Sequence, residues 1–180
     1  TGGKELSEIH KTFINSEGFI DFDLLFPTPE CLRDFEPHMG IIGAAKALRE
    51  SDVSGNKLIA ALEFSNRESD LDRYEKPESE GGFSDKEKKL VDRAVSNIKE
   101  CGYAYWYDWR VGNWGTKWGA YGQGDGVSND AKEFTFETAW NHPAKIIEAI
   151  SKANPSVIFN IKYADEDTGS NCGLYIIHEG

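Results

Sequence analysis

Hydrophobic and polar positions repeat along this chain with two different periods, one typical of helices and one typical of strands. Apolar residues at helical spacing predict helices over residues 4–16, 41–49, 58–64, 84–101, 106–113 and 143–153. Alternating apolar and polar residues predict strands over residues 20–26, 116–121, 134–140, 157–163 and 172–178. This order predicts an α+β fold, with helices on one face of an antiparallel sheet and a hairpin at the end.

Several predicted helix boundaries carry residues that satisfy or end the backbone hydrogen-bond pattern. Ser84 and Glu87 have the spacing of a capping box, in which each side chain accepts a hydrogen bond from the other residue's backbone N–H. Gly102 can take the left-handed conformation that ends a helix. Asn141 is expected to cap the last helix, and Pro143 fits its first turn.

The least regular part of the sequence is residues 31–83. Short helices are predicted there at 41–49 and 58–64, while residues 67–82 are charged and rich in Ser, Glu and Gly. That composition is typical of a surface loop. We therefore interpret residues 1–180 as a single α+β domain that carries a variable insertion at about 31–83.

The chain is acidic, and its charge limits the partners that it can bind. The formal net charge is −11, from 31 acidic residues against 20 lysines and arginines. A large nucleic-acid interface needs a basic face, so this balance disfavours one and favours an acidic surface that binds basic partners. No apolar run is long enough to span a membrane, and the first residues do not have the pattern of a signal peptide.

The three cysteines, Cys31, Cys101 and Cys172, are far apart and odd in number. None belongs to a Cys-x-x-Cys pair. This pattern predicts free, reduced thiols in a cytosol-like compartment, with Cys101 buried at a helix end rather than reactive.

Aromatic residues are concentrated in one stretch, residues 103–121, which contains four of the five tryptophans. Large rings at this density form either a core or a binding surface. The core interpretation makes the rings a joint between helix and sheet, whereas the binding interpretation places them beside cations in a groove that takes a base or an anion. The candidate binding residues are Asp108, Trp109, Arg110, Asn113, Trp114, Lys117, Trp118 and Trp140.

Other chemistry-bearing residues give weaker signals. Carboxylates surround the tryptophan stretch, but nothing in the sequence fixes a catalytic pair or a metal set among them. The four histidines lack metal-ligand spacing, and His142 is expected to be a surface residue at a helix start. There is no Gly-x-Ser-x-Gly nucleophile motif. We therefore predict no catalytic residues, no metal and no cofactor.

Four segments resemble the YubB-like ferredoxin-like domain family of phage, prophage and plasmid proteins. They are Tyr105–Arg110, Asn113–Trp118, Phe136–Trp140 and Phe22–Pro29. The resemblance implies a ferredoxin-like fold and a mobile-element origin, but no particular activity. Members begin with a short strand that ends near Thr-Gly, and this chain opens on Thr1 and Gly2. The first strand of the family pattern is therefore expected to be missing.

Three functions remain open from the sequence. The leading hypothesis is a phage- or mobile-element-encoded interaction protein in the bacterial cytoplasm, whose acidic surface binds a host protein of defence or nucleic-acid processing. The first alternative is a domain that binds a nucleotide, another small anionic ligand or single-stranded nucleic acid through the tryptophan stretch. The second is a metal-dependent hydrolase that uses carboxylates such as Asp108 and Glu137. The sequence does not predict the oligomeric state.

Overall fold

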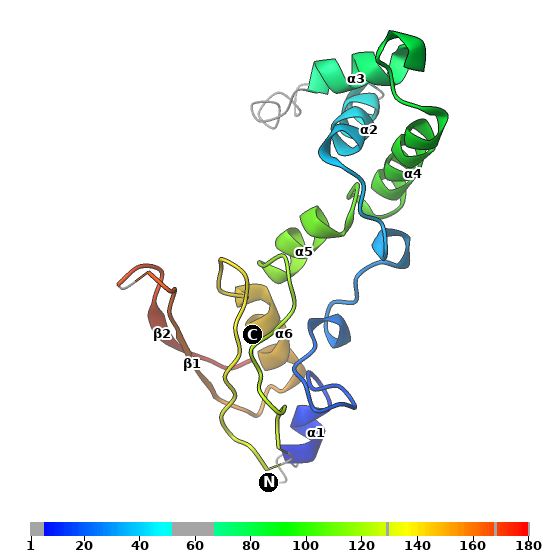
Figure 1. Ribbon diagram of the computed structural model, residues 1–180. Helices are drawn as coiled ribbons and strands as arrows, with labels where there is room; N and C mark the ends of the chain where they lie inside the picture. The colour runs from blue at the N-terminus through cyan, green and yellow to red at the C-terminus, as the bar shows by residue number, and fades with distance from the viewer. Residues whose placement is uncertain (1–5, 52–66, 129, 168, 180) are drawn as a thin grey trace. The chain divides into compact units, whose positions relative to one another are not determined.

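The computed structural model of the chain describes residues 6–51, 67–128, 130–167 and 169–179 (Figure 1). By their contacts the residues form two compact units, which we treat separately. The helical unit is Pro29–Trp109, and the mixed unit combines Thr1–Thr28 with Arg110–Gly180. The interpretation of residues 1–180 as one domain with an insertion stays a prediction.

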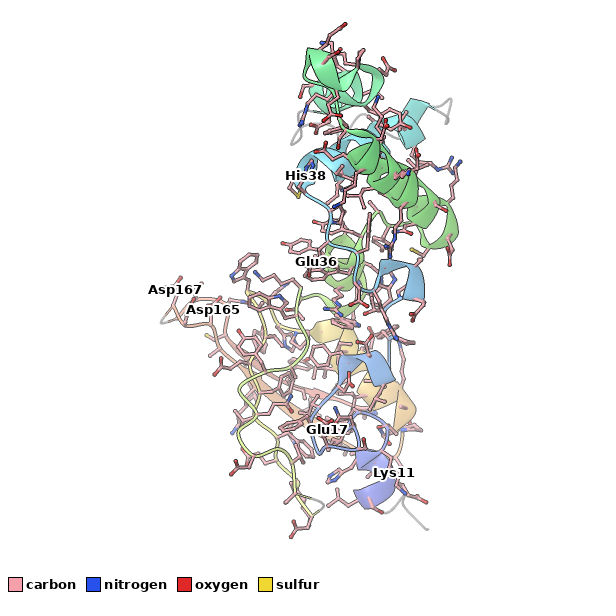
Figure 2. The ribbon with its side chains drawn as sticks, turned by 45° about the vertical axis from the view of Figure 1, so that its right-hand side comes forward. Lys11, Glu17, Glu36, His38, Asp165 and Asp167 are labelled. Carbon is pink, nitrogen blue, oxygen red and sulfur yellow. The ribbon has the colours of Figure 1, made fainter. Side chains whose placement is uncertain are left out.

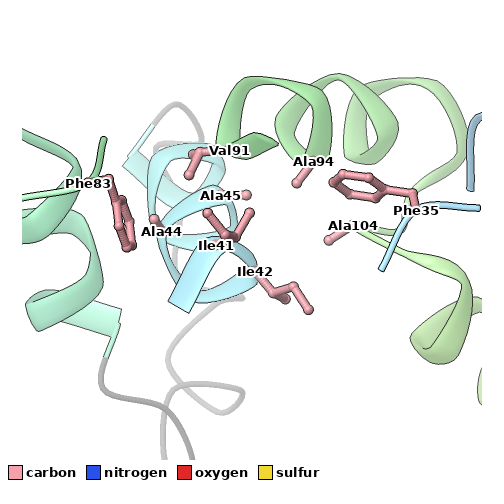
Figure 3. Close-up of a cluster of buried hydrophobic side chains, with 9 residues drawn as sticks. All are labelled: Phe35, Ile41, Ile42, Ala44, Ala45, Phe83, Val91, Ala94 and Ala104. Atoms are coloured by element: carbon pink, nitrogen blue, oxygen red, sulfur yellow. The ribbon is translucent and has the colours of Figure 1, made fainter. Parts of the chain in front are cut away.

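The described residues of the helical unit include α2 (Met39–Ser51), α3 (Arg67–Glu75) and α4 (Asp85–Cys101). Helix α2 contacts both α3 and α4 (Figure 1). Figure 3 shows the buried cluster between these elements, in which aliphatic side chains meet two phenylalanine rings. The cluster consists of Phe35, Ile41, Ile42, Ala44, Ala45, Phe83, Val91, Ala94 and Ala104.

Helix α4 confirms the capping box that its sequence predicts. The Ser84 hydroxyl accepts a hydrogen bond from the backbone N–H of Glu87, and a Glu87 carboxylate oxygen accepts one from the backbone N–H of Ser84. At the other end Gly102 is left-handed, with φ of 84°, and its N–H donates to the carbonyl of Ile98. Both ends of α4 are therefore set by residues within one turn of the helix.

The prediction of a surface loop over residues 67–82 is wrong for its first half, which forms α3. Gly43 on α2 makes room for this helix, because a Cβ at that position would overlap the carboxylate of Asp70. Packing on α2 thus stabilises a helix that the polar sequence of α3 does not predict. The predicted helix at 58–64 lies outside the described residues.

The mixed unit contains α1 (Leu6–His10), α6 (Ala144–Ala153), β1 (Phe159–Tyr163) and β2 (Gly173–Ile177). The two strands pair antiparallel, with Phe159 opposite Ile177 and Tyr163 opposite Gly173. This confirms the predicted terminal hairpin and the α+β class. In the part of the chain that the structure describes, the regular sheet consists of these two strands.

Three predicted strands are absent from the described residues of the mixed unit. Residues 20–26 instead contain a 3-10 turn, because the side chain of Asp21 accepts from the backbone N–H of Asp23 and bends the chain. Residues 116–121 and 134–140 meet in one isolated bridge, between Tyr121 and Glu137. Alternating apolar residues are present there, but backbone pairing does not continue along them.

The predicted first helix, over residues 4–16, is shorter in the structure, because α1 ends at His10 and turns follow. Helix α6 begins after Pro143, which occupies the N-cap position without a side-chain cap, so the prediction of Asn141 as the cap is wrong. Its apolar face is as predicted, since Ile146, Ile147 and Ile150 are buried. None of the helices among the described residues is both long enough and apolar enough to cross a membrane.

Candidate functional site

Helix α5 (Trp106–Trp114) carries three of the four tryptophans of the stretch and spans the boundary between the two units. The short helix predicted here is confirmed, and it continues through Gly112. It ends at Trp114, and the next residue, Gly115, is left-handed with φ of 84°. This conformation favours glycine, because any other residue would strain the backbone.

Two of the candidate tryptophans are buried and therefore form part of the scaffold. Trp109 is 8% exposed and Trp114 is 2% exposed. The indole N–H of Trp114 donates to the carbonyl of Phe26 at 3.0 Å, and its ring meets Phe22 edge-to-face. Trp114 thus fixes the Phe22–Phe26 segment within the mixed unit, which explains the ring without a ligand.

The other two tryptophans lie on the surface of the mixed unit with a tyrosine and a lysine. Trp140 is 72% exposed, Trp118 49% and Tyr121 40%. The rings of Trp118 and Tyr121 meet edge-to-face, with centroids 6.2 Å apart. We call Lys117, Trp118, Tyr121 and Trp140 the aromatic surface. A buried core would hide these rings, so the core interpretation does not apply to this part of the stretch, and the binding interpretation stays a prediction.

Lys117 joins the rings of the aromatic surface. Its ammonium nitrogen lies 3.4 Å from the ring centroid of Trp140 and 4.1 Å from that of Trp118. Both distances are within the range of a cation–π interaction. The strand predicted over residues 116–121 would place Lys117 and Trp118 on opposite faces, and the structure brings them into contact because these residues form no strand.

The backbone of Trp140 has an uncommon conformation. Its φ is 64°, in the left-handed region that residues other than Gly, Asn and Asp seldom adopt. Such strain costs of order 1–3 kcal/mol and tends to occur at functional sites. Here the left-handed backbone places the large, solvent-exposed ring of Trp140 against Lys117. This ring does not pack in the core.

The polar candidates of α5 have separate roles. Asp108 belongs to the helical unit, where it accepts a hydrogen bond from the Lys46 ammonium at 2.7 Å. Burial, followed by the charge of Asp108, raises the pKa of Tyr105 to about 12, so that phenol stays protonated. Arg110 belongs to the mixed unit, where its Nε donates to the Thr28 hydroxyl and its guanidinium lies over the Trp114 ring.

An open groove of 410 Å³ lies in the mixed unit next to the aromatic surface. Arg110, Asp21 and Asp23 bring charge to its wall, and Tyr121 lines it as well. Gln123 holds the groove together, since its amide accepts from the backbone N–H of Ile20 and donates to the carbonyl of the same residue. Asn113 lies elsewhere, in a second hollow with Lys145 and Glu148.

Tyr121 is not among the candidate residues taken from the sequence, and His142 is not the surface residue that was expected. The His142 ring is half-buried and stacks on Tyr163 with centroids 4.3 Å apart. Its Nε2 lies 2.7 Å from the hydroxyl of Tyr175. Burial lowers the pKa of His142, which favours the neutral ring. The residue therefore anchors α6 to the hairpin instead of standing on the surface.

Within the described residues, no group of three or more His, Cys, Asp or Glu side chains is placed to hold a metal ion. Of the two carboxylates singled out for the hydrolase hypothesis, Asp108 belongs to the helical unit and Glu137 to the mixed unit. The side chain of Glu137 is exposed beside Gly122.

Comparison with protein families gives a match over part of the mixed unit. Residues 113–180, less than half of the chain, are similar to a family described as "ferredoxin-like domain in Api92-like protein". This confirms the ferredoxin-like fold class predicted from the sequence. The matched segment contains the whole aromatic surface, whereas Tyr105–Arg110 and Phe22–Pro29 lie outside it. No curated protein and no solved structure matches the chain.

Proposed function

We propose that this chain is an interaction protein of a phage or another mobile genetic element, and that it binds a basic host protein in the bacterial cytoplasm. The aromatic surface of Lys117, Trp118, Tyr121 and Trp140 makes the central contact. The observation that carries the proposal is the exposure of three neighbouring large rings, two of which contact one cation. Rings exposed to this extent contribute little to the fold, so another role explains them better.

The composition of the aromatic surface favours a protein partner. Trp and Tyr are the residues most often found to dominate binding energy at protein interfaces, because they bury a large area with few rotatable bonds. The contact of Lys117 with Trp118 and Trp140 holds these rings before a partner arrives. A surface arranged in advance loses less conformational entropy on binding.

Charge favours a basic partner over nucleic acid. The whole chain carries −11, and residues 113–180 contain nine acidic residues against five lysines. Figure 2 shows Asp165 and Asp167 in the turn between β1 and β2, and Glu17 in the turn after α1. Such a field attracts a basic protein surface and repels phosphates. A host defence or nucleic-acid-processing enzyme with a basic groove has the complementary charge.

The origin in a mobile element rests on the resemblance to YubB-like proteins. The segments Asn113–Trp118 and Phe136–Trp140 carry that resemblance, and they also supply Lys117, Trp118 and Trp140 of the aromatic surface. The same residues therefore support both the origin and the binding role.

The test compares two double variants with the wild-type chain. Trp118→Ala with Trp140→Gly removes two exposed rings, and the glycine also relieves the left-handed backbone at position 140. Leu174→Ala with Ile176→Ala is the control, because these side chains are 68% and 64% exposed in β2 but outside the aromatic surface. Each protein is used to capture partners from bacterial lysate, and the affinity for a purified captured protein is then measured by calorimetry.

We expect the double tryptophan variant to bind a captured basic protein roughly 30-fold or more weakly, while the control retains its affinity. Equal losses in the two variants, or none in either, would overturn the proposal. Single-stranded oligonucleotides are titrated in parallel, with tryptophan fluorescence as the readout. Quenching that disappears in the tryptophan variant would favour the nucleic-acid alternative and reject the protein partner.

A further inference from the structure

Two cysteines that are 70 positions apart in the sequence meet inside the helical unit. The sulfur of Cys31 lies 3.8 Å from the sulfur of Cys101. Cys31 belongs to a 3-10 turn, Glu30–Leu32, and Cys101 is the last residue of α4. A disulfide needs the sulfurs at about 2.0 Å, and rotation of the two side chains about χ1 can provide that change.

The surrounding contacts hold the turn against α4. The guanidinium of Arg93 on α4 donates to the Cys31 carbonyl at 3.3 Å and lies 4.5 Å from the ring centroid of Phe35. Phe35 is 2% exposed and packs in the buried cluster with Ala94 of α4. The sulfur of Cys101 lies 3.2 Å from the carbonyl of Asn97. The proximity of the two sulfurs is therefore fixed by packing that does not depend on a bond between them.

We infer that Cys31 and Cys101 are a redox-modification site, at which a peroxide oxidises the two thiols to an intramolecular disulfide. Two S–H bonds break and one S–S bond forms, so the pair loses two electrons and two protons. The peroxide accepts both, its O–O bond breaks, and it leaves as two molecules of water or, for an organic peroxide, as water and an alcohol. This inference goes beyond the proposed binding function, which uses a surface of the mixed unit.

The reduced pair is stable in the absence of an oxidant. Burial, followed by the hydrogen bond with Cys101, raises the pKa of the Cys31 thiol to about 11. Thiolates are the reactive form, so this thiol reacts slowly at neutral pH. In the mixed unit, Cys172 is exposed and would react with the oxidant as well, so the experiment removes it.

Oxidation would tie the turn to the end of α4 across a long loop. Closing a loop of this length restricts the unfolded chain strongly, so the disulfide is expected to stabilise the helical unit. The bond would act as a lock on this unit that a reductant reverses.

The experiment uses the full chain with Cys172→Ser, reduced and then treated with hydrogen peroxide. We expect both remaining thiols to disappear from a thiol titration and the intact mass to fall by two hydrogens. Peptide mapping should join the peptide of Cys31 to that of Cys101. The melting temperature should rise by roughly 10 °C or more, and a phosphine reductant should reverse the rise.

Two further variants, Cys31→Ser and Cys101→Ser in the same background, serve as controls. Neither should form an intramolecular link or show the rise in melting temperature. The inference is overturned if the parent protein instead gains oxygen at the two sulfurs without a link. A disulfide between two chains, seen on a non-reducing gel, would overturn it as well. A loss of binding by the aromatic surface leaves these readouts unchanged, so the two proposals fail separately.

Discussion

The helical unit and the mixed unit maintain their structures by different means. In the described part of the helical unit, α2, α3 and α4 pack around a buried hydrophobic cluster, and α4 has its capping partners within its own first and last turns. In the mixed unit, long irregular segments are joined by side chains that bind distant backbone groups. Such bonds run from Trp114 to Phe26, from Thr116 to Ala139, and between Gln123 and Ile20.

This difference indicates where a single substitution should lower the stability most. A helix satisfies its own backbone, so the loss of one cap weakens only one end. An irregular segment depends on a few long-range donors and acceptors, and the loss of one leaves a partner group without a hydrogen bond. Single substitutions in the mixed unit should therefore cost more than matched ones in the helical unit, except where they fall on its exposed rings.

The largest expected effect belongs to Trp114→Ala. The variant loses a ring that is 2% exposed and the hydrogen bond to the Phe26 carbonyl. We expect the free energy of unfolding to fall by about 3–5 kcal/mol, measured by urea denaturation. Trp118→Ala is the matched control, and its 49% exposed ring should change stability by less than about 0.5 kcal/mol. Similar values for the two variants would contradict the division into buried and exposed tryptophans.

A smaller effect is expected for Gln123→Ala. It removes the acceptor of the Ile20 N–H and the donor to the Ile20 carbonyl, at a cost of about 1–3 kcal/mol. The local counterpart is Ser84→Ala in the helical unit, with a cost of about 0.5–2 kcal/mol for the loss of a helix cap. Amide hydrogen exchange at Ile20 and at Glu87 reports each site separately. Faster amide exchange of Ile20 in the Ser84 variant would show that loss of the cap weakens more than its own helix, against this prediction.

The capping box also gives the helical unit a pH dependence. Hydrogen bonds from the Ser84 hydroxyl and backbone N–H hold the pKa of Glu87 at about 2, below its ordinary value of 4.5. A lowered carboxyl pKa stabilises the fold above the ordinary value, and this stability is lost as the pH falls towards 2. The melting temperature of wild type should exceed that of Glu87→Gln at pH 7, and the gap should close between pH 4.5 and 2. A gap that persists at pH 2 would disprove the assignment.

A small effect on stability is expected for Lys117→Ala. The ammonium contacts two exposed rings, and such contacts are worth about 0.5–1 kcal/mol at most. Removal of the cation should nevertheless change the tryptophan emission spectrum and free the ring of Trp140. An unchanged spectrum in Lys117→Ala, beside a changed spectrum in Trp140→Gly, would show that the cation does not rest on the ring.

The sequence predicted the fold well wherever local signals decide it. The ends of α4 were predicted from Ser84, Glu87 and Gly102. The hairpin was predicted from the alternation of apolar and polar residues before and after residues 165–171. The prediction failed over residues 116–121 and 134–140, which have the same alternation. Strand pairing depends on distant backbone partners, and alternation shows which side chains share a face but not whether such a partner exists.

The candidate site was predicted in part. The density of rings indicated residues 103–121, and Lys117, Trp118 and Trp140 do lie together on a surface. The sequence could not separate these residues from Trp109 and Trp114, because burial depends on segments such as Phe22–Phe26 that are distant in the chain. The contact of Cys31 with Cys101 was missed for the same reason, since a spacing of 70 residues carries no local signal.

The left-handed backbone of Trp140 has a consequence for how this position tolerates change over evolution. Glycine or asparagine would occupy a φ of 64° at a lower cost, so selection for stability alone would replace the tryptophan. A ring that is 72% exposed adds little to core packing, so packing does not offset the cost of the left-handed backbone. If the aromatic surface binds a partner, position 140 is under opposing selection, and relatives that have lost the partner should drift to small residues there.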